Sequence, residues 1–141
     1  MTVSKFKTQC DQLLSDLLEG CGFVYSKVAA RPRGIIVQYR RNEESIILGW
    51  DEGELILDLI LKNSNSDWMR VSVNQFFWSL GSRTLMSAET CEEKLQILRA
   101  EFTINWGFFL NKESVNFNSR YCYKMSEMEY GIYMNAQFAD R

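Results

Sequence analysis

The stretch Glu44–Lys62, with the sequence ESIILGWDEGELILDLILK, decides the fold because it has the pattern of two β-strands joined by a tight turn. Apolar side chains alternate on both sides of Asp51-Glu52-Gly53, a segment with strong turn propensity. The alternating residues that share one face are Ile46, Leu48, Trp50, Leu55, Leu57, Leu59 and Leu61. A two-stranded ribbon cannot bury such a face by itself, so the rest of the chain must supply a covering layer.

Two more strands and a helix are expected before this hairpin. Apolar residues recur at steps of three and four over Ser4–Glu19, which predicts an amphipathic helix with Ser4 as its cap. Strands are expected over Phe23–Ala30, at a sheet edge, and over Gly34–Arg41, with a proline- and glycine-containing turn between them. Together with the hairpin, these segments predict a four-stranded antiparallel meander over Phe23–Lys62.

Helices are expected after the hairpin. A short helix is predicted near Val71–Leu80, and a longer one begins at Thr90, where a capping-box spacing to Glu93 is present, and continues to about Leu110. The second half of this segment also alternates, so a fifth strand is the alternative there. A last helix is predicted from the spacing of Met125, Met128, Ile132 and Ala136.

The chain is therefore expected to form one α+β domain over residues 1–141, with the C-terminal helices packed on one face of the meander. Leucines at positions that match single faces of these elements are the expected core. They are Leu13, Leu17, Leu55, Leu57, Leu59, Leu95 and Leu98.

Composition limits the classes of function. A formal net charge of −2 argues against nucleic-acid binding through phosphate neutralisation. The first residues lack the apolar core of a signal peptide, and no segment approaches the roughly 20 apolar residues of a membrane span, so we expect a cytoplasmic protein with no membrane association. There is no histidine, and the four cysteines have neither disulfide nor metal-site spacing, so we expect reduced thiols, no metal and no cofactor.

Charged residues are segregated along the sheet-forming segment. A basic run, which consists of Lys27, Arg31, Arg33, Arg40 and Arg41, precedes a run of carboxylates that no lysine or arginine interrupts between residues 43 and 58. One interpretation is that the two runs pair across neighbouring strands on a solvated face, where each exposed pair contributes about 0 to 1 kcal/mol. The other is that part of the acidic run stays unpaired and binds a basic partner.

The second interpretation predicts a partner-binding surface in which carboxylates alternate with apolar groups. Its residues are Glu43, Glu44, Asp51, Glu52, Glu54, Ile56, Asp58 and Ile60. The C-terminal segment is the alternative occupant of this face, and it would bury the isoleucines and leave the carboxylates at the rim.

We expect no catalytic residues. Glu54 and Asp58 lie about 13 Å apart on a strand, at about 3.3 Å per residue, which exceeds the separations of carboxylate pairs in glycoside hydrolysis. A cysteine nucleophile would need an activator, and the absence of histidine removes the commonest one. The sequence therefore favours a binding protein over an enzyme.

The order of elements over Ser4–Leu110, the Gly22-Phe23 pair after the first helix and the acidic hairpin ILGWDEGELILDLIL resemble the small bacterial immunity proteins of polymorphic and contact-dependent toxin systems. The resemblance implies a non-catalytic inhibitor that binds a cognate, basic toxin at or beside its active region and occludes it. Two alternatives remain open. One is a secretion chaperone that holds an effector segment, and the other is a small enzyme or ligand-binding domain with a pocket between helix and sheet.

Overall fold

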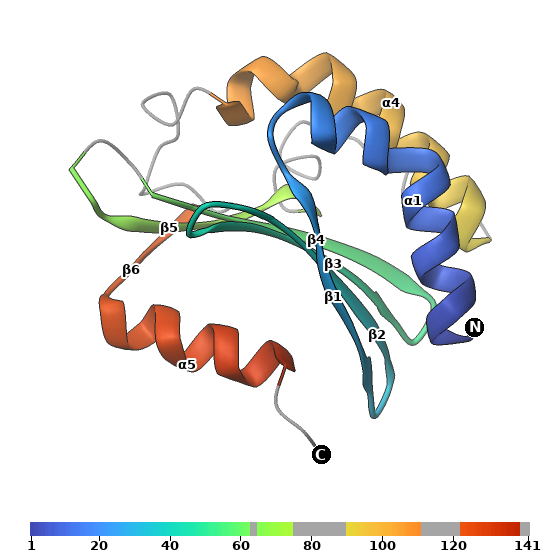
Figure 1. Cartoon of the computed structure of the whole chain (residues 1–141), viewed down its shortest axis with the longest axis horizontal. Coiled ribbons are helices and arrows are strands. Elements are labelled where there is room, and N and C mark those ends of the chain that lie inside the picture. The colour runs from blue at the N-terminus through green and yellow to red at the C-terminus, as the bar shows by residue number, and fades with distance from the viewer. Residues whose placement is uncertain (63–64, 75–89, 111–121, 139–141) are drawn as a thin grey trace.

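The computed structural model describes residues 1–62, 65–74, 90–110 and 122–138, and it confirms the predicted hairpin (Figure 1). Strands β3 (Glu44–Asp51) and β4 (Glu54–Lys62) pair in antiparallel register, with Leu48 opposite Leu57. Glu52 and Gly53 form the turn with φ angles of 50° and 85°, a conformation for which glycine is the most favourable residue. The turn chemistry of the sequence therefore fixes the register of the central strands.

The hairpin lies in the middle of a six-stranded antiparallel sheet in the order β1-β2-β3-β4-β5-β6. Strands β1 (Val24–Arg31) and β2 (Gly34–Arg41) lie where they were predicted, and β1 is an edge strand. The sheet continues through β5 (Trp68–Ser72) and β6 (Cys122–Met125), so it has two more strands than the four that were predicted. The meander pattern itself is confirmed.

Strand β5 corrects only the first two residues, Val71 and Ser72, of the helix predicted near Val71–Leu80. Residues Trp68 to Ser72 extend along β4, with Val71 opposite Leu59, because an exposed edge of β4 offers this apolar segment a ladder of backbone partners. Only Val73 and Asn74 adopt a helical conformation, and residues 75–80 lie outside the described part of the chain. Sequence propensity alone could not predict this strand, because it carries no information about the free edge of β4 with which the segment pairs.

Two helices cover the leucine face of the sheet, α1 (Val3–Gly20) and α4 (Cys91–Leu110). The hydroxyl of Thr2, and not that of Ser4, caps α1 by accepting a hydrogen bond from the Lys5 amide at 3.1 Å. The predicted cap at Thr90 is confirmed by a hydrogen bond from the Glu93 amide at 3.1 Å. The segment after Thr90 is thus one continuous helix, and the alternative of a fifth strand there is wrong.

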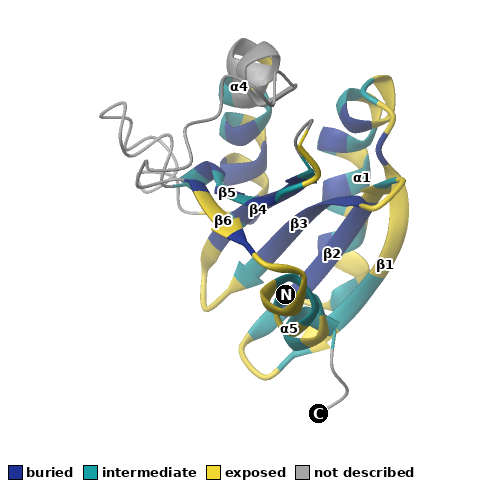
Figure 2. Cartoon of the chain, turned by 90° about the vertical axis from the view of Figure 1, so that its left-hand side faces the viewer, coloured by how far each residue is buried: buried dark blue, intermediate teal, exposed yellow. Residues whose placement is uncertain are grey.

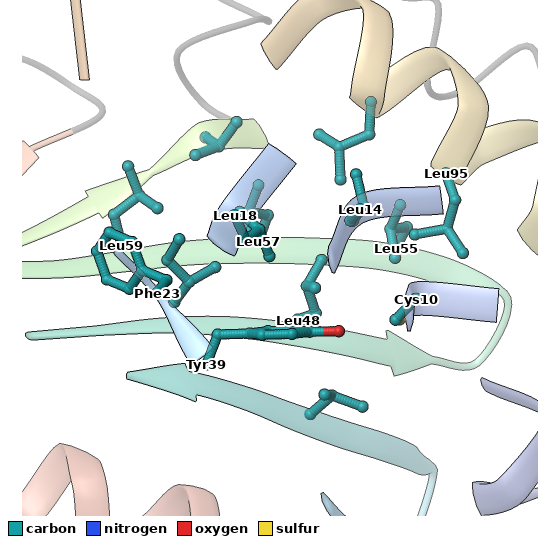
Figure 3. Packing of buried hydrophobic residues seen from close by; sticks show 14 of the residues in the cluster. Cys10, Leu14, Leu18, Phe23, Tyr39, Leu48, Leu55, Leu57, Leu59 and Leu95 are labelled. Carbon is teal, nitrogen blue, oxygen red and sulfur yellow. The ribbon is translucent and has the colours of Figure 1, made fainter. Parts of the chain in front are cut away.

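The main core lies between these helices and the sheet (Figure 3). The predicted core leucines from the sheet and α4 are buried, whereas Leu13 and Leu17 are only half-buried. The stripe of α1 that faces the sheet consists of Phe6, Cys10, Leu14 and Leu18. The helix is therefore rotated slightly from the predicted orientation, so that Leu13 and Leu17 lie at the margin of the core.

The last helix, α5 (Glu127–Phe138), lies on the opposite face of the sheet (Figures 1 and 2). Helices α4 and α5 therefore lie on opposite faces of the sheet, whereas the sequence had suggested that the C-terminal helices share one face. The predicted stripe of α5 was also wrong, because Met128 and Ile132 are 73% and 64% exposed. The stripe that packs on the sheet is larger and more aromatic: Tyr130, Tyr133, Met134 and Phe138, over Ile36, Ile47, Ile60, Trp68 and Met125.

Within the described residues, no helix is both long and apolar enough to cross a bilayer.

The central position of Leu57 gives the first prediction. Leu57 is 3% exposed, so Leu57→Ala should lower the free energy of unfolding by about 2 to 5 kcal/mol through lost burial and a residual cavity. Urea unfolding monitored by tryptophan fluorescence measures this change. Ile132→Ala on the outer face of α5 is the matched control and should change stability by less than about 0.5 kcal/mol. Equal effects of the two substitutions would contradict the observed placement of the core.

Candidate functional site

Most of the acidic residues predicted to bind a partner lie at two separate ends of the central hairpin. Glu43 and Glu44 lie at the β2–β3 turn, whereas Asp51, Glu52 and Glu54 lie at the β3–β4 turn. The ends are roughly 23 Å apart, at about 3.3 Å per residue along β3. The acidic run is continuous in sequence, but it does not form one surface in space.

The carboxylates at the β2–β3 end are engaged within the protein. Glu44 is buried, pairs with Arg41 at 3.0 Å and accepts a hydrogen bond from the backbone amide of Lys62 at 3.0 Å. Glu43 is exposed and pairs with the Lys62 ammonium at 3.3 Å. This end of the hairpin therefore follows the interpretation in which the acidic and basic side chains neutralise one another.

The middle of the predicted surface lies beneath α5. Ile60 is fully buried, and Asp58 is 5% exposed. Asp58 Oδ2 accepts a hydrogen bond from the Tyr133 hydroxyl at 2.7 Å and pairs with Arg70 at 3.0 Å, while the Arg70 guanidinium lies 4.6 Å from the centre of the Tyr133 ring. Burial, together with the neighbouring Asp58 carboxylate, raises the pKa of Tyr133 well above its ordinary value. This network fixes α5 to the sheet.

The carboxylates at the β3–β4 end remain open to solvent. Asp51 and Glu54 are exposed and face each other as paired residues across the hairpin, and they make no ion pair with any residue that the structure describes. Like charges directly opposite each other on neighbouring strands destabilise a sheet. Glu52, in the turn between them, pairs with Arg33 at 3.7 Å, and both of these side chains are mostly exposed. The corner therefore carries uncompensated negative charge.

A cavity of about 420 Å³ opens beside this corner, between α5 and the sheet. It exists because α5 crosses the sheet obliquely: Tyr130 stacks on Trp68 of β5 with ring centres 4.0 Å apart, and the far end of α5 contacts β1. The floor of the cavity is a row of facing residues from three neighbouring strands, Ile36, Gly49 and Ile56. Polar groups at its walls come from Arg31, Asp51, Asp58, Tyr133 and Gln137.

Most of the basic run is engaged in holding this arrangement together. The Arg31 guanidinium donates hydrogen bonds to the carbonyl oxygens of Ala136 and Gln137, where the negative end of the α5 dipole lies. Lys27 lies 4.1 Å from the centre of the Phe138 ring. Arg33 pairs with Glu52, whereas Arg31 and Lys27 keep their positive charges and are held in place by their contacts with α5.

In the described part of the chain, no group of three or more metal-binding side chains could hold an ion. All four cysteines lie among the described residues, and none forms a disulfide there, in agreement with the predicted reduced thiols. Burial raises the pKa of Cys91 and of Cys122 to about 11, and it raises that of Cys10 still further, so these thiols are poor nucleophiles. The described groups at the cavity can bind a ligand through charge, hydrogen bonds and apolar contact.

Comparisons with protein-family models, curated proteins and solved structures found no match to this chain.

Several residues of the cavity escaped sequence reasoning. Tyr133 and Gln137 were missed because the wrong stripe of α5 was assigned to the sheet. Gly49 carried a usable signal, since a glycine within a strand of apolar residues often marks an open space or a close approach. A Cβ at this position would meet its nearest neighbours at 3.8 to 4.0 Å, which is ordinary van der Waals contact. Gly49 thus leaves space above the sheet and is not required by backbone crowding.

The bond between Tyr133 and Asp58 gives a second prediction. Tyr133→Phe removes a hydrogen bond to a buried carboxylate and should cost about 1.5 to 3 kcal/mol, concentrated in the docking of α5. Hydrogen exchange of the α5 amides is the measurement, and these amides should exchange faster than in the parent. Tyr25→Phe, at an exposed tyrosine of β1, is the control. Unchanged protection of α5 in Tyr133→Phe would show that this bond does not hold the helix.

The cysteines give a third prediction, about alkylation at pH 8 in the native protein. Half-buried Cys21 should react first, while Cys10, Cys91 and Cys122 should react only on unfolding, because at a pKa of about 11 roughly one thiol in a thousand is ionised at this pH. Mass spectrometry of the native and urea-unfolded protein counts the modified sites. Rapid native modification of Cys91 or Cys122 would be inconsistent with this burial.

Proposed function

We propose that the chain is a non-catalytic protein-binding module whose β3–β4 corner binds a basic partner. The observation that carries the proposal is the contrast between the ends of the hairpin. Glu43 and Glu44 are paired internally, whereas Asp51 and Glu54 face each other in solvent and pair with no cation among the residues that the structure describes. A basic partner would relieve their mutual repulsion, and it would approach faster because of the same charge.

Apolar contact is available beside these carboxylates, and it gives the corner a second property of a protein interface. Ile56 is half-buried in the floor of the cavity, and α5 forms a rigid wall, held by Arg31 at one end and by the stacked Trp68 and Tyr130 rings at the other. A partly apolar centre with charged groups at its rim is the usual composition of a protein–protein interface. We define the binding corner as Asp51, Glu52, Glu54, Ile56 and the cavity beside them.

Within this class, we propose an immunity protein, which neutralises a cognate toxin by covering its active region. The proposal rests on the resemblance in element order together with the acidic corner, because the active regions of many toxins that act on nucleic acid are basic. The partner would be held by the corner and by the surface around it, and no covalent chemistry is needed. A small-ligand-binding domain is the second candidate, and the volume of the cavity, about 420 Å³, favours it.

Charge reversal at the corner provides the fourth prediction. Asp51→Lys/Glu54→Lys should weaken binding to the partner by about tenfold or more at low salt and slow its association, with little change in the unfolding midpoint because both side chains are exposed. Asp51→Asn/Glu54→Gln should have a smaller effect in the same direction. The tagged proteins are compared by affinity purification from cells of the natural host, followed by kinetic measurements with the purified partner.

The control must make the same change in net charge elsewhere. Glu19→Lys/Glu43→Lys does so with two exposed acids near the β2–β3 end, and it should retain the partner as the parent does. Co-expression then tests inhibition: the partner alone should be toxic, and the parent chain, but not the corner variant, should restore growth. A partner that is acidic, or one that the corner variant and the control retain equally, would refute the proposal.

A further inference from the structure

We propose that the cavity beside α5 is a socket for one arginine or lysine side chain of the partner protein. This inference rests on the proposed function, because it assigns the binding corner a specific chemical element to recognise. The aliphatic stem would lie on Ile36, Gly49 and Ile56, and the cationic head would bind Asp58. Asp51 also lines the cavity, and Glu54 faces Asp51 across the hairpin.

Asp58 is the first part of the evidence because only one of its oxygens is used. Tyr133 and Arg70 both bind Oδ2, and no described residue donates a hydrogen bond to Oδ1. Asp58 lines this cavity although the residue as a whole is only 5% exposed. Oδ1 is not among the described side-chain atoms that are both fully buried and without a partner, so it keeps some accessible surface. A donor that enters the cavity lined by Asp58 would gain a charge-assisted hydrogen bond there.

The floor of the cavity supplies the second part. Gly49 lies between Ile36 and Ile56 on the neighbouring strands, and its missing side chain leaves an apolar trough between two isoleucines. Arginine and lysine place three or four methylene groups between the backbone and the charge, and these stems pack readily on apolar surface. Ile47, Gly49 and Asp51 all line the cavity and span about 13 Å along β3, at about 3.3 Å per residue, so the trough is long enough to favour a long side chain over a short one.

The balance of charge determines the sign of the guest. Two arginines line the cavity, but Arg31 is bound to the carbonyl end of α5 and Arg33 to Glu52. The carboxylates of Asp51 and Glu54 have no such counter-charge in the described part of the chain. Arg31 keeps its positive charge, but Asp51 and Glu54 carry two negative charges against it, so the described charges favour a cation over an anion of the same size.

Small probes test the socket without the partner. The full chain, labelled with ¹⁵N, is titrated with Nα-acetyl-arginine amide, Nα-acetyl-lysine amide and the neutral isostere Nα-acetyl-citrulline amide. The arginine or the lysine probe should shift the backbone amides of Gly49 and Ile56 with a Kd in the millimolar range. Citrulline amide should bind at least about tenfold more weakly, because it has the same shape without the charge.

A variant that fills the apolar trough with a side chain of the protein itself tests the same site. Gly49→Leu adds a side chain where a Cβ meets only ordinary contacts, and it should abolish probe binding while the protein remains folded. Gly49→Ala should weaken probe binding by an intermediate amount. Because it adds only a methyl group, it tests the same position if the larger substitution disturbs folding. Glu19→Lys/Glu43→Lys should bind the probes as the parent does.

The outcomes separate the socket from the proposed function. Three results would overturn the socket. The citrulline and arginine probes could bind equally, the amide shifts could map to another part of the chain, or no amide shift could occur at millimolar probe. Normal capture of the partner by Gly49→Leu would also overturn it, even if Asp51→Lys/Glu54→Lys loses the partner and so supports the proposed function. Specific probe binding by a chain that captures no protein would keep the cation site and remove its protein partner.

Discussion

The structure depends on a strand that is apolar on both faces. Strand β4 carries four leucines on one face, and Ile56 and Ile60 flank Asp58 on the other. Each face must be removed from water, and hydrophobic burial is the dominant favourable term in folding. Helices α1 and α4 cover the leucine face, which leaves the second face for α5. The chain is therefore a three-layer structure, with the sheet between two layers of helix (Figure 2).

The second layer is incomplete, and this incompleteness creates the candidate site. Helix α5 has 12 residues, or roughly 18 Å at about 1.5 Å per residue, which is too short to cover a six-stranded face. Its contacts with β5, β4 and β1 direct it obliquely over the sheet, so the corner at the β3–β4 turn is left open.

The carboxylates of the acidic run also differ in whether a cationic side chain pairs with them. Where a basic side chain is within reach, as at Glu44, Glu43 and Asp58, the carboxylate is paired. The arginine nearest to the open corner on β1, Arg31, is occupied by the carbonyl groups at the end of α5. Docking of α5 thus uses Arg31 as a hydrogen-bond donor to the helix, and Asp51 forms no ion pair with any described residue.

The sequence by itself determined the β1–β4 meander, the hairpin register and the extents of α1 and α4, because alternation, turn residues and caps act between near neighbours. It also indicated which carboxylates to consider. Only the tertiary structure decided which of them stay open, since that depends on whether a distant side chain such as Tyr133 or Arg70 reaches them. The same holds for β5, β6 and the face that α5 buries. These depend on a free sheet edge and on a second apolar face, and both exist only once the meander has formed.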